Sequence, residues 1–81
     1  MTSLIDTIRL LIEASIDCDR IEVDGDGRHF QATIVSKAFE GKRLVQRHQM
    51  VYAALGDSMR EQIHALSMKT LTPQEFQHSN G

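Results

Sequence analysis

The sequence has few of the residues that build covalent or metal-bound frameworks. Its 81 residues include one cysteine, one proline and no tryptophan. A single cysteine excludes an internal disulfide framework and any metal site built from several thiolates of one chain. No apolar run approaches the ~18 residues of a membrane span, and no signal peptide is visible at the N-terminus. We therefore expect a cytoplasmic protein without a membrane segment, in which Cys18 stays reduced.

An excess of charge of one sign is also absent. Nine basic and eleven acidic side chains give a formal net charge of −2. This balance excludes a strongly cationic protein that coats nucleic acid or membranes by charge alone. The charges are segregated, however, because residues 1–28 carry seven acidic and three basic side chains, whereas residues 29–55 carry one acidic and four basic ones. The middle of the chain is the only basic region.

Length and composition are those of one small domain. Hydrophobic residues make up 41% of the chain and charged residues 25%, which is the balance of an ordinary soluble domain. We predict a single domain over residues 1–76 and a flexible tail over residues 77–81, where the sequence becomes polar.

Hydrophobic periodicity predicts the element order αββαβα. The expected elements are a helix capped at Thr2-Ser3 and ending near Ile16, strands over 20–24 and 29–35 with a turn at 25–28, a helix over 44–55, a strand over 63–70, and a helix opened by Thr72-Pro73-Gln74-Glu75. A strand–helix–strand crossover makes the second and third strands parallel if they share a sheet. The expected fold is α+β, with a three-stranded mixed sheet packed with helices. Its core should contain Ile8, Leu11, Ile12, Val23, Phe30, Ile34, Val51, Leu55 and Leu66.

Two histidines should meet at one end of this sheet. His29 begins the second predicted strand and His64 lies near the beginning of the third, and neighbouring parallel strands begin at the same edge, about 4.8 Å apart. Two imidazoles are too few for a closed zinc site, but they are enough for half of a metal site that a partner completes. Composition alone favours the alternative, in which neither histidine is a ligand.

Motifs of catalysis are missing. The sequence has no nucleophile elbow, phosphate loop, paired-histidine zinc motif or dinucleotide fingerprint, so nothing in it argues for an enzyme. Cys18 is flanked by Asp17 and Asp19, which disfavour a thiolate, and we do not expect it to bind metal.

Five motifs occur in a characteristic order along the chain. They are Val23-Asp24-Gly25-Asp26-Gly27-Arg28-His29-Phe30, Ser36-x-x-Phe39-Glu40-Gly41, Val45-Gln46-Arg47-His48-Gln49-Met50-Val51-Tyr52, Ile63-His64-Ala65-Leu66 and Thr72-Pro73-Gln74-Glu75-Phe76. Together they resemble the BolA family, and most of all its IbaG-like branch, over roughly residues 4–76.

The resemblance implies a class II KH-like fold and a cytosolic partner of monothiol glutaredoxins. Such a pair shares a [2Fe-2S] cluster that the glutaredoxin cysteine and a glutathione thiol hold from one side. For this chain the resemblance implies that His64 is one ligand and that His29 is the second. It also implies that the protein holds no cofactor tightly when alone, and that it is then a monomer or a weak homodimer.

A nucleic-acid-binding role is the competing hypothesis. Some members of the family are described as transcriptional regulators of cell morphology and the stress response, and KH-like folds bind nucleic acids through a GxxG loop. The corresponding segment here, Gly41-Lys42-Arg43-Leu44, lacks the second glycine. Contacts to phosphate would come from Lys42, Arg43 and Arg47. The alternative is a solvated basic surface, and with so few clustered bases we expect only weak DNA binding.

Overall fold

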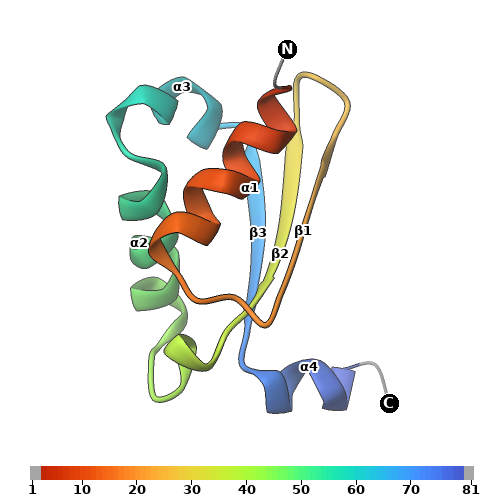
Figure 1. Ribbon diagram of the computed structural model, residues 1–81, viewed down its shortest axis with the longest axis vertical. Helices are drawn as coiled ribbons and strands as arrows, with labels where there is room; N and C mark the ends of the chain where they lie inside the picture. Colours follow the sequence, from red (N-terminus) through yellow and green to blue (C-terminus); the bar gives the residue numbers. More distant parts are fainter. Residues whose placement is uncertain (1–2, 80–81) are drawn as a thin grey trace.

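The two longest helices pack on one face of a three-stranded sheet in the computed structural model of the protein, and the C-terminal helix lies at the end of the sheet (Figure 1). The structure describes residues 3–79 and, within that range, the side chains of all positions except 58, 62, 63 and 79. The elements are α1 (Leu4–Ser15), β1 (Arg20–Gly25), β2 (Phe30–Val35), the 3-10 turn η1 (Lys37–Phe39), α2 (Leu44–Leu55), the 3-10 turn η2 (Asp57–Met59), α3 (Arg60–Ile63), β3 (Leu66–Leu71) and α4 (Pro73–Ser79). The predicted αββαβα order is confirmed, with α3 as an added helical turn before β3.

The signals at the helix ends act as the sequence predicts. The Asp6 N–H donates to Ser3 Oγ at 3.1 Å at the start of α1, while Thr2 lies outside the described residues. The Glu75 N–H donates to Thr72 Oγ1 at 3.2 Å and the Thr72 N–H donates to Glu75 Oε1 at 2.8 Å, which completes a capping box at α4. Gly56 follows α2 with a φ of 72°, a left-handed conformation that glycine adopts without strain.

The sheet has the strand order β1-β2-β3. β1 pairs with β2 in the antiparallel direction, and β2 pairs with β3 in the parallel direction, so the predicted mixed sheet is confirmed. Phe30, Ala32 and Ile34 of β2 are buried toward α1 and α2, and Gln31 between them is exposed on the opposite face. This alternation gives the sheet one face packed against helices and one face that is largely polar.

The core is close to the predicted one. Buried side chains include Ile8, Ile12, Phe30, Ile34, Val51 and Leu55, and the other three predicted members, Leu11, Val23 and Leu66, are half-buried against the same cluster. The sequence analysis missed Phe39, whose side chain is fully buried in η1. A 3-10 turn of three residues has no hydrophobic periodicity, so its one core residue carries no pattern.

Two predicted boundaries differ from the structure. The third strand was expected over 63–70, but β3 begins at Leu66, because α3 continues through Ile63 and residues 64–65 form a turn. His64 is therefore in a turn and not on a strand. The predicted tail begins at residue 77, whereas α4 continues to Ser79; residues 80–81 lie outside the described residues.

One further finding concerns the helices of residues 3–79. None of them has the length and apolar character that crossing a membrane requires.

Replacing Phe39 by alanine should strongly destabilise the fold. The side chain is 0% exposed, and truncating a buried phenylalanine costs about 3–5 kcal/mol. Urea unfolding monitored by circular dichroism measures this loss. Leu10→Ala is the control, because Leu10 is 55% exposed and should change the unfolding free energy by no more than about 0.5 kcal/mol. Equal losses for the two variants would contradict the placement of Phe39.

Candidate functional site

The two histidines lie at the same end of the sheet. β2 begins at Phe30, directly after His29, and β3 begins at Leu66, two residues after His64. Phe30 and Leu66 are partners in the parallel pairing, and the Phe30 N–H donates to the carbonyl of Ala65 at 2.8 Å. This hydrogen bond joins the two residues that immediately follow the histidines. The β1–β2 hairpin, α3 and the start of α1 all lie at this end (Figure 1).

His64 borders an open groove on the side of the helices. Its side chain is exposed in the turn between α3 and β3. The groove has a volume of about 560 Å³, and the other residues that line it are Tyr52, Ala53, Gly56, Asp57 and Arg60. The sequence analysis did not single out Tyr52 or Arg60. No helical spacing indicates them, because α3 ends at Ile63 and His64 follows it in a turn.

His29 borders a second groove on the other face of the sheet. This groove of about 320 Å³ is also lined by Asp24, Gly25, Asp26 and Gln31. Asp24 and Gln31 are paired across β1 and β2 and are both exposed, on the face opposite the core. The topology therefore brings the two histidines to one end of the molecule, as predicted, but their side chains line different grooves.

Asp26 organises the hairpin turn that carries His29. Its Oδ1 accepts hydrogen bonds from the Arg28 N–H at 2.9 Å and the His29 N–H at 2.8 Å, and its own N–H donates to the His29 carbonyl at 3.1 Å. The bond from the His29 backbone is the largest reason that the pKa of Asp26 is lowered, because it stabilises the charged carboxylate. The turn is thus held mainly by one carboxylate.

Gly25 is required where the hairpin turn begins. A Cβ at this position would lie 2.6 Å from the His29 carbonyl oxygen and 2.7 Å from a ring carbon of Phe30. Both distances are shorter than real carbon contacts, and the first involves backbone, so any side chain here would force the two strands apart at the turn.

The donors of this chain suit half of a metal site. In residues 3–79, excluding the undescribed side chains, no group of three or more His, Cys, Asp and Glu side chains could hold a metal ion. Cys18 cannot complete such a site, because it lies in the connection before β1, at the end of the sheet where β2 finishes. Burial and the nearby carboxylates of Glu13, Asp17 and Asp19 raise the pKa of its thiol, in that order of importance.

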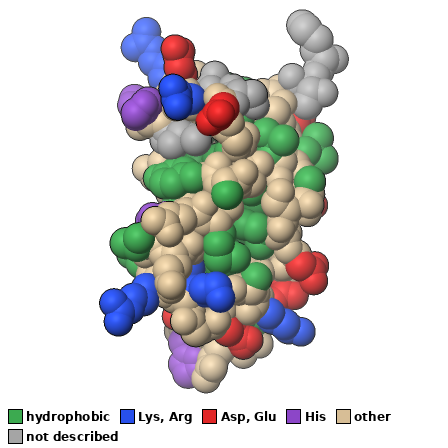
Figure 2. All heavy atoms as spheres, turned by 90° about the vertical axis from the view of Figure 1, so that its left-hand side faces the viewer, with side chains coloured by type: hydrophobic (Ala, Val, Ile, Leu, Met, Phe, Trp, Pro, Cys, Tyr) green, Lys and Arg blue, Asp and Glu red, His purple; other side chains and the backbone are tan. Residues whose placement is uncertain are grey.

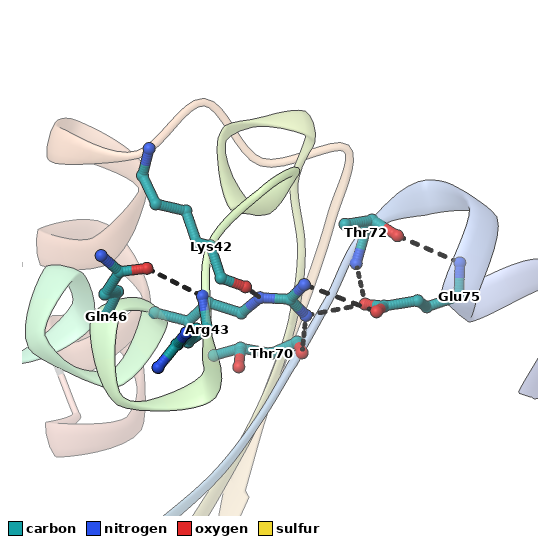
Figure 3. A network of polar contacts seen from close by, with 7 residues as sticks. Lys42, Arg43, Gln46, Thr70, Thr72 and Glu75 are labelled. Atoms are coloured by element: carbon teal, nitrogen blue, oxygen red, sulfur yellow. Dashed lines mark hydrogen bonds and ion pairs between the residues drawn. The ribbon is translucent and has the colours of Figure 1, made fainter.

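Arg47, the third predicted phosphate contact, is occupied within the protein (Figure 3). Its side chain is 11% exposed. The guanidinium donates to the carbonyls of Lys42 and Thr70 at 2.9 and 3.1 Å and to Glu75 Oε1 at 2.7 Å, and it lies 5.9 Å from the centre of the Phe39 ring. A phosphate would have to displace a carboxylate that already binds Arg47.

Lys42 and Arg43 remain exposed beside the N-terminus of α2. The backbone N–H of Arg43 donates to Gln46 Oε1 at 2.8 Å, so its part in the helix cap uses the main chain. The predicted basic site therefore consists of two accessible side chains and one that is engaged elsewhere.

Comparison with known proteins identifies the family of this fold. Residues 10–75 match the family described as "BolA-like protein". The chain belongs to the BolA-like family. It is 34% identical over 70 residues to the acid stress protein IbaG of Escherichia coli, a match that covers 85% of this chain and 83% of that protein. It is 45% identical over 56 residues to the Vibrio cholerae protein named DNA-binding transcriptional regulator BolA, covering 69% of this chain and 53% of the relative. The match thus spans about half the length of that relative.

Solved structures of the BolA-like family share the fold described above. A bolA protein homologue from Coxiella burnetii superposes with a TM-score of 0.77 at 42% identity, over 95% of this chain and 99% of that structure. The class II KH-like αββαβα architecture that the sequence motifs implied is therefore the fold of this BolA-like chain.

Replacing Glu75 by glutamine should destabilise the protein at neutral pH and much less in acid. The hydrogen bond from Arg47 is the main reason that the pKa of Glu75 falls from 4.5 to about 2. Because the folded-state pKa is the lower one, the ionised pair stabilises the protein above about pH 4.5, and this contribution is lost as the pH falls toward 2. Thermal unfolding of both proteins across this range measures the difference.

The size of that difference should also depend on salt. The Glu75 side chain is 47% exposed, so high salt should reduce the advantage of the native protein. Glu61→Gln serves as the control, because Glu61 is exposed in α3. A stability gap between native protein and Glu75→Gln that does not narrow in acid would contradict the assigned role of this carboxylate.

Proposed function

We propose that this BolA-like protein is a cytoplasmic partner of a monothiol glutaredoxin and shares a [2Fe-2S] cluster with it, for iron–sulfur trafficking or iron and redox sensing. In this proposal the protein is an adaptor and not an enzyme. The observation that carries the proposal is the exposed position of His64, in a turn at the border of an open groove. An imidazole in that position can be reached by a ligand that a second protein presents.

The chemistry of the donors supports a shared group. Two histidines and a protonated, distant cysteine cannot enclose a cluster, so thiolates must come from the partner. When bound, the cluster supplies one-electron chemistry and transferable iron and sulfide, and imidazole ligands raise its potential relative to thiolates. The chain holds the backbone next to His64 firmly, because Ala65 accepts the 2.8 Å hydrogen bond from Phe30.

The surface beside His64 is suited to a protein partner. Seen from the side of α2 and α3, hydrophobic side chains occupy the middle of the surface and charged side chains lie toward its ends (Figure 2). Tyr52, in the last turn of α2, is 39% exposed beside His64, whereas the more exposed Leu44 and Val45 lie at the other end of the same helix. Tyrosine and arginine carry much of the energy in protein interfaces, and Tyr52 and Arg60 border the same groove as His64.

The three candidate ligands should respond differently to substitution. The mixed cluster is assembled from the protein, a monothiol glutaredoxin, iron, sulfide and glutathione, and visible circular dichroism reports its ligand set. His64→Ala should abolish the mixed-cluster spectrum. His29→Ala should alter its shape or lifetime, because His29 sits on an exposed turn whose ordering costs conformational entropy. Cys18→Ser should leave it unchanged, because the thiol lies about 20 Å away along a six-residue strand at about 3.3 Å per residue.

The result that would refute this assignment is equally specific. Loss of the spectrum in Cys18→Ser with retention in His29→Ala would place the second ligand at the other end of the sheet. Retention of the full spectrum in His64→Ala would remove the proposal as a whole.

A nucleic-acid-binding regulator is the second candidate function. The Vibrio cholerae relative whose name includes DNA binding favours it, and Lys42 and Arg43 are exposed at the start of α2. Against it stand the net charge of −2 and the engagement of Arg47 with Glu75. In this alternative the protein would regulate the stress response and cell morphology.

The salt dependence of DNA binding should separate these roles. Lys37, Lys42 and Arg43 are the exposed bases of the central segment. Each phosphate contact contributes about −0.9 to the slope of log affinity against log salt, so three contacts predict a slope of about −2.7. Fluorescence anisotropy with a duplex of random sequence measures it, and Arg47→Gln should not reduce the slope. Tight, sequence-selective binding at physiological salt would favour the regulator.

A further inference from the structure

The two histidines line different grooves at the same end of the sheet. His29 lines a groove on the polar face of the sheet, and His64 lines a groove beside α2. We propose that Asp26 is a positioning residue, whose carboxylate holds His29 away from His64 until the hairpin turn opens. The ligand role of His29 rests on the proposed function, whereas the action of Asp26 on the backbone rests on the hydrogen bonds of the turn.

The turn has little to hold it apart from Asp26. Residues 26–29 are all exposed, so burial of side chains contributes little to their conformation. Asp26 accepts the N–H groups of Arg28 and His29 and donates its own N–H to the His29 carbonyl. Gly27 has a φ of 96°, which closes the turn tightly and suits glycine alone. Removing the carboxylate therefore removes two of the three hydrogen bonds of the turn, one of them made by His29 itself.

The residues on both sides of the turn are fixed. Gly25 is in register opposite Phe30, and the two strands approach closely there. The Phe30 side chain is 4% exposed, and its N–H is bonded to the Ala65 carbonyl. Movement is thus confined to residues 26–29. Because Ala65 is the neighbour of His64, this hydrogen bond holds the backbone beside His64, and the proposal assigns the movement to His29.

Asp24 offers a matched control for Asp26. Both carboxylates line the groove of His29, so either substitution removes the same charge from it. In the described part of the chain, Asp24 binds only the N–H of its neighbour Gly25, at 2.8 Å, and makes no bond to residues 28–29. Asp26→Asn is the conservative variant, because its amide oxygen can accept the same two N–H groups.

The test uses Ni²⁺ alone and the full chain alone, by isothermal titration calorimetry. Asp26→Ala should bind one Ni²⁺ per chain on the order of ten-fold tighter than the native protein, because a second imidazole of the same chain acts at high effective concentration. The gain should disappear when His29→Ala or His64→Ala is added. Asp24→Ala and Asp26→Asn should match the native protein.

A second variant distinguishes opening of the turn from other effects of removing the Asp26 side chain. Gly27→Ala leaves the carboxylate in place and meets no atom within 4 Å, but it strains the turn through its φ of 96°, so it should also tighten Ni²⁺ binding. The proposal is overturned if neither variant binds more tightly, if the gain survives His64→Ala, or if it occurs at one ion per two chains. Because glutaredoxin is absent, these results are independent of whether His29 alters the mixed-cluster spectrum.

Discussion

The parallel pairing of β2 with β3 determines which groups of this protein can meet. The crossover through α2 and α3 returns the chain along the full length of the sheet, so both strands begin at the hairpin end and finish at the α4 end. β2 and β3 therefore begin at the same end of the sheet, where His29 and His64 lie. Both strands end at the opposite end of the sheet, where the hydrogen bonds of Arg47 join the start of α2, the end of β3 and α4. If one of the two strands ran in the opposite direction, His29 and His64 would lie at opposite ends of the sheet, and so would the groups that Arg47 joins.

The fold could be predicted wherever a local signal determined the structure. Ser3, Gly56 and the Thr72–Glu75 box act within three or four residues of themselves, and each one ends or begins a helix as expected. The start of β3 was not predictable in this way. Residues 63–70 are apolar at both even and odd positions, so alternation did not show where helix gives way to strand. Phe39 was missed because a short turn has no period.

For the candidate site, the sequence could predict which end of the sheet each residue occupies but not which groove its side chain lines. Strand direction placed His29 and His64 at one end, but the groove that each side chain lines depends on whether its residue precedes a strand directly or stands in a turn. The engagement of Arg47 was beyond the sequence analysis, because its partner Glu75 lies 28 residues along the chain. A pairing over that distance is a product of the tertiary structure and leaves no short-range pattern.

Cys18 has a consequence for how a complex of this kind would respond to oxidants. It is the only cysteine of the chain, and its half-buried thiol, with its raised pKa, stays protonated at neutral pH. Oxidants and disulfides react with thiolates far faster than with thiols. The Cys18 thiol is therefore less reactive toward oxidants than an ordinary exposed cysteine. In the proposed complex, sensitivity to disulfide stress would therefore enter mainly through the sulfur ligands of the partner.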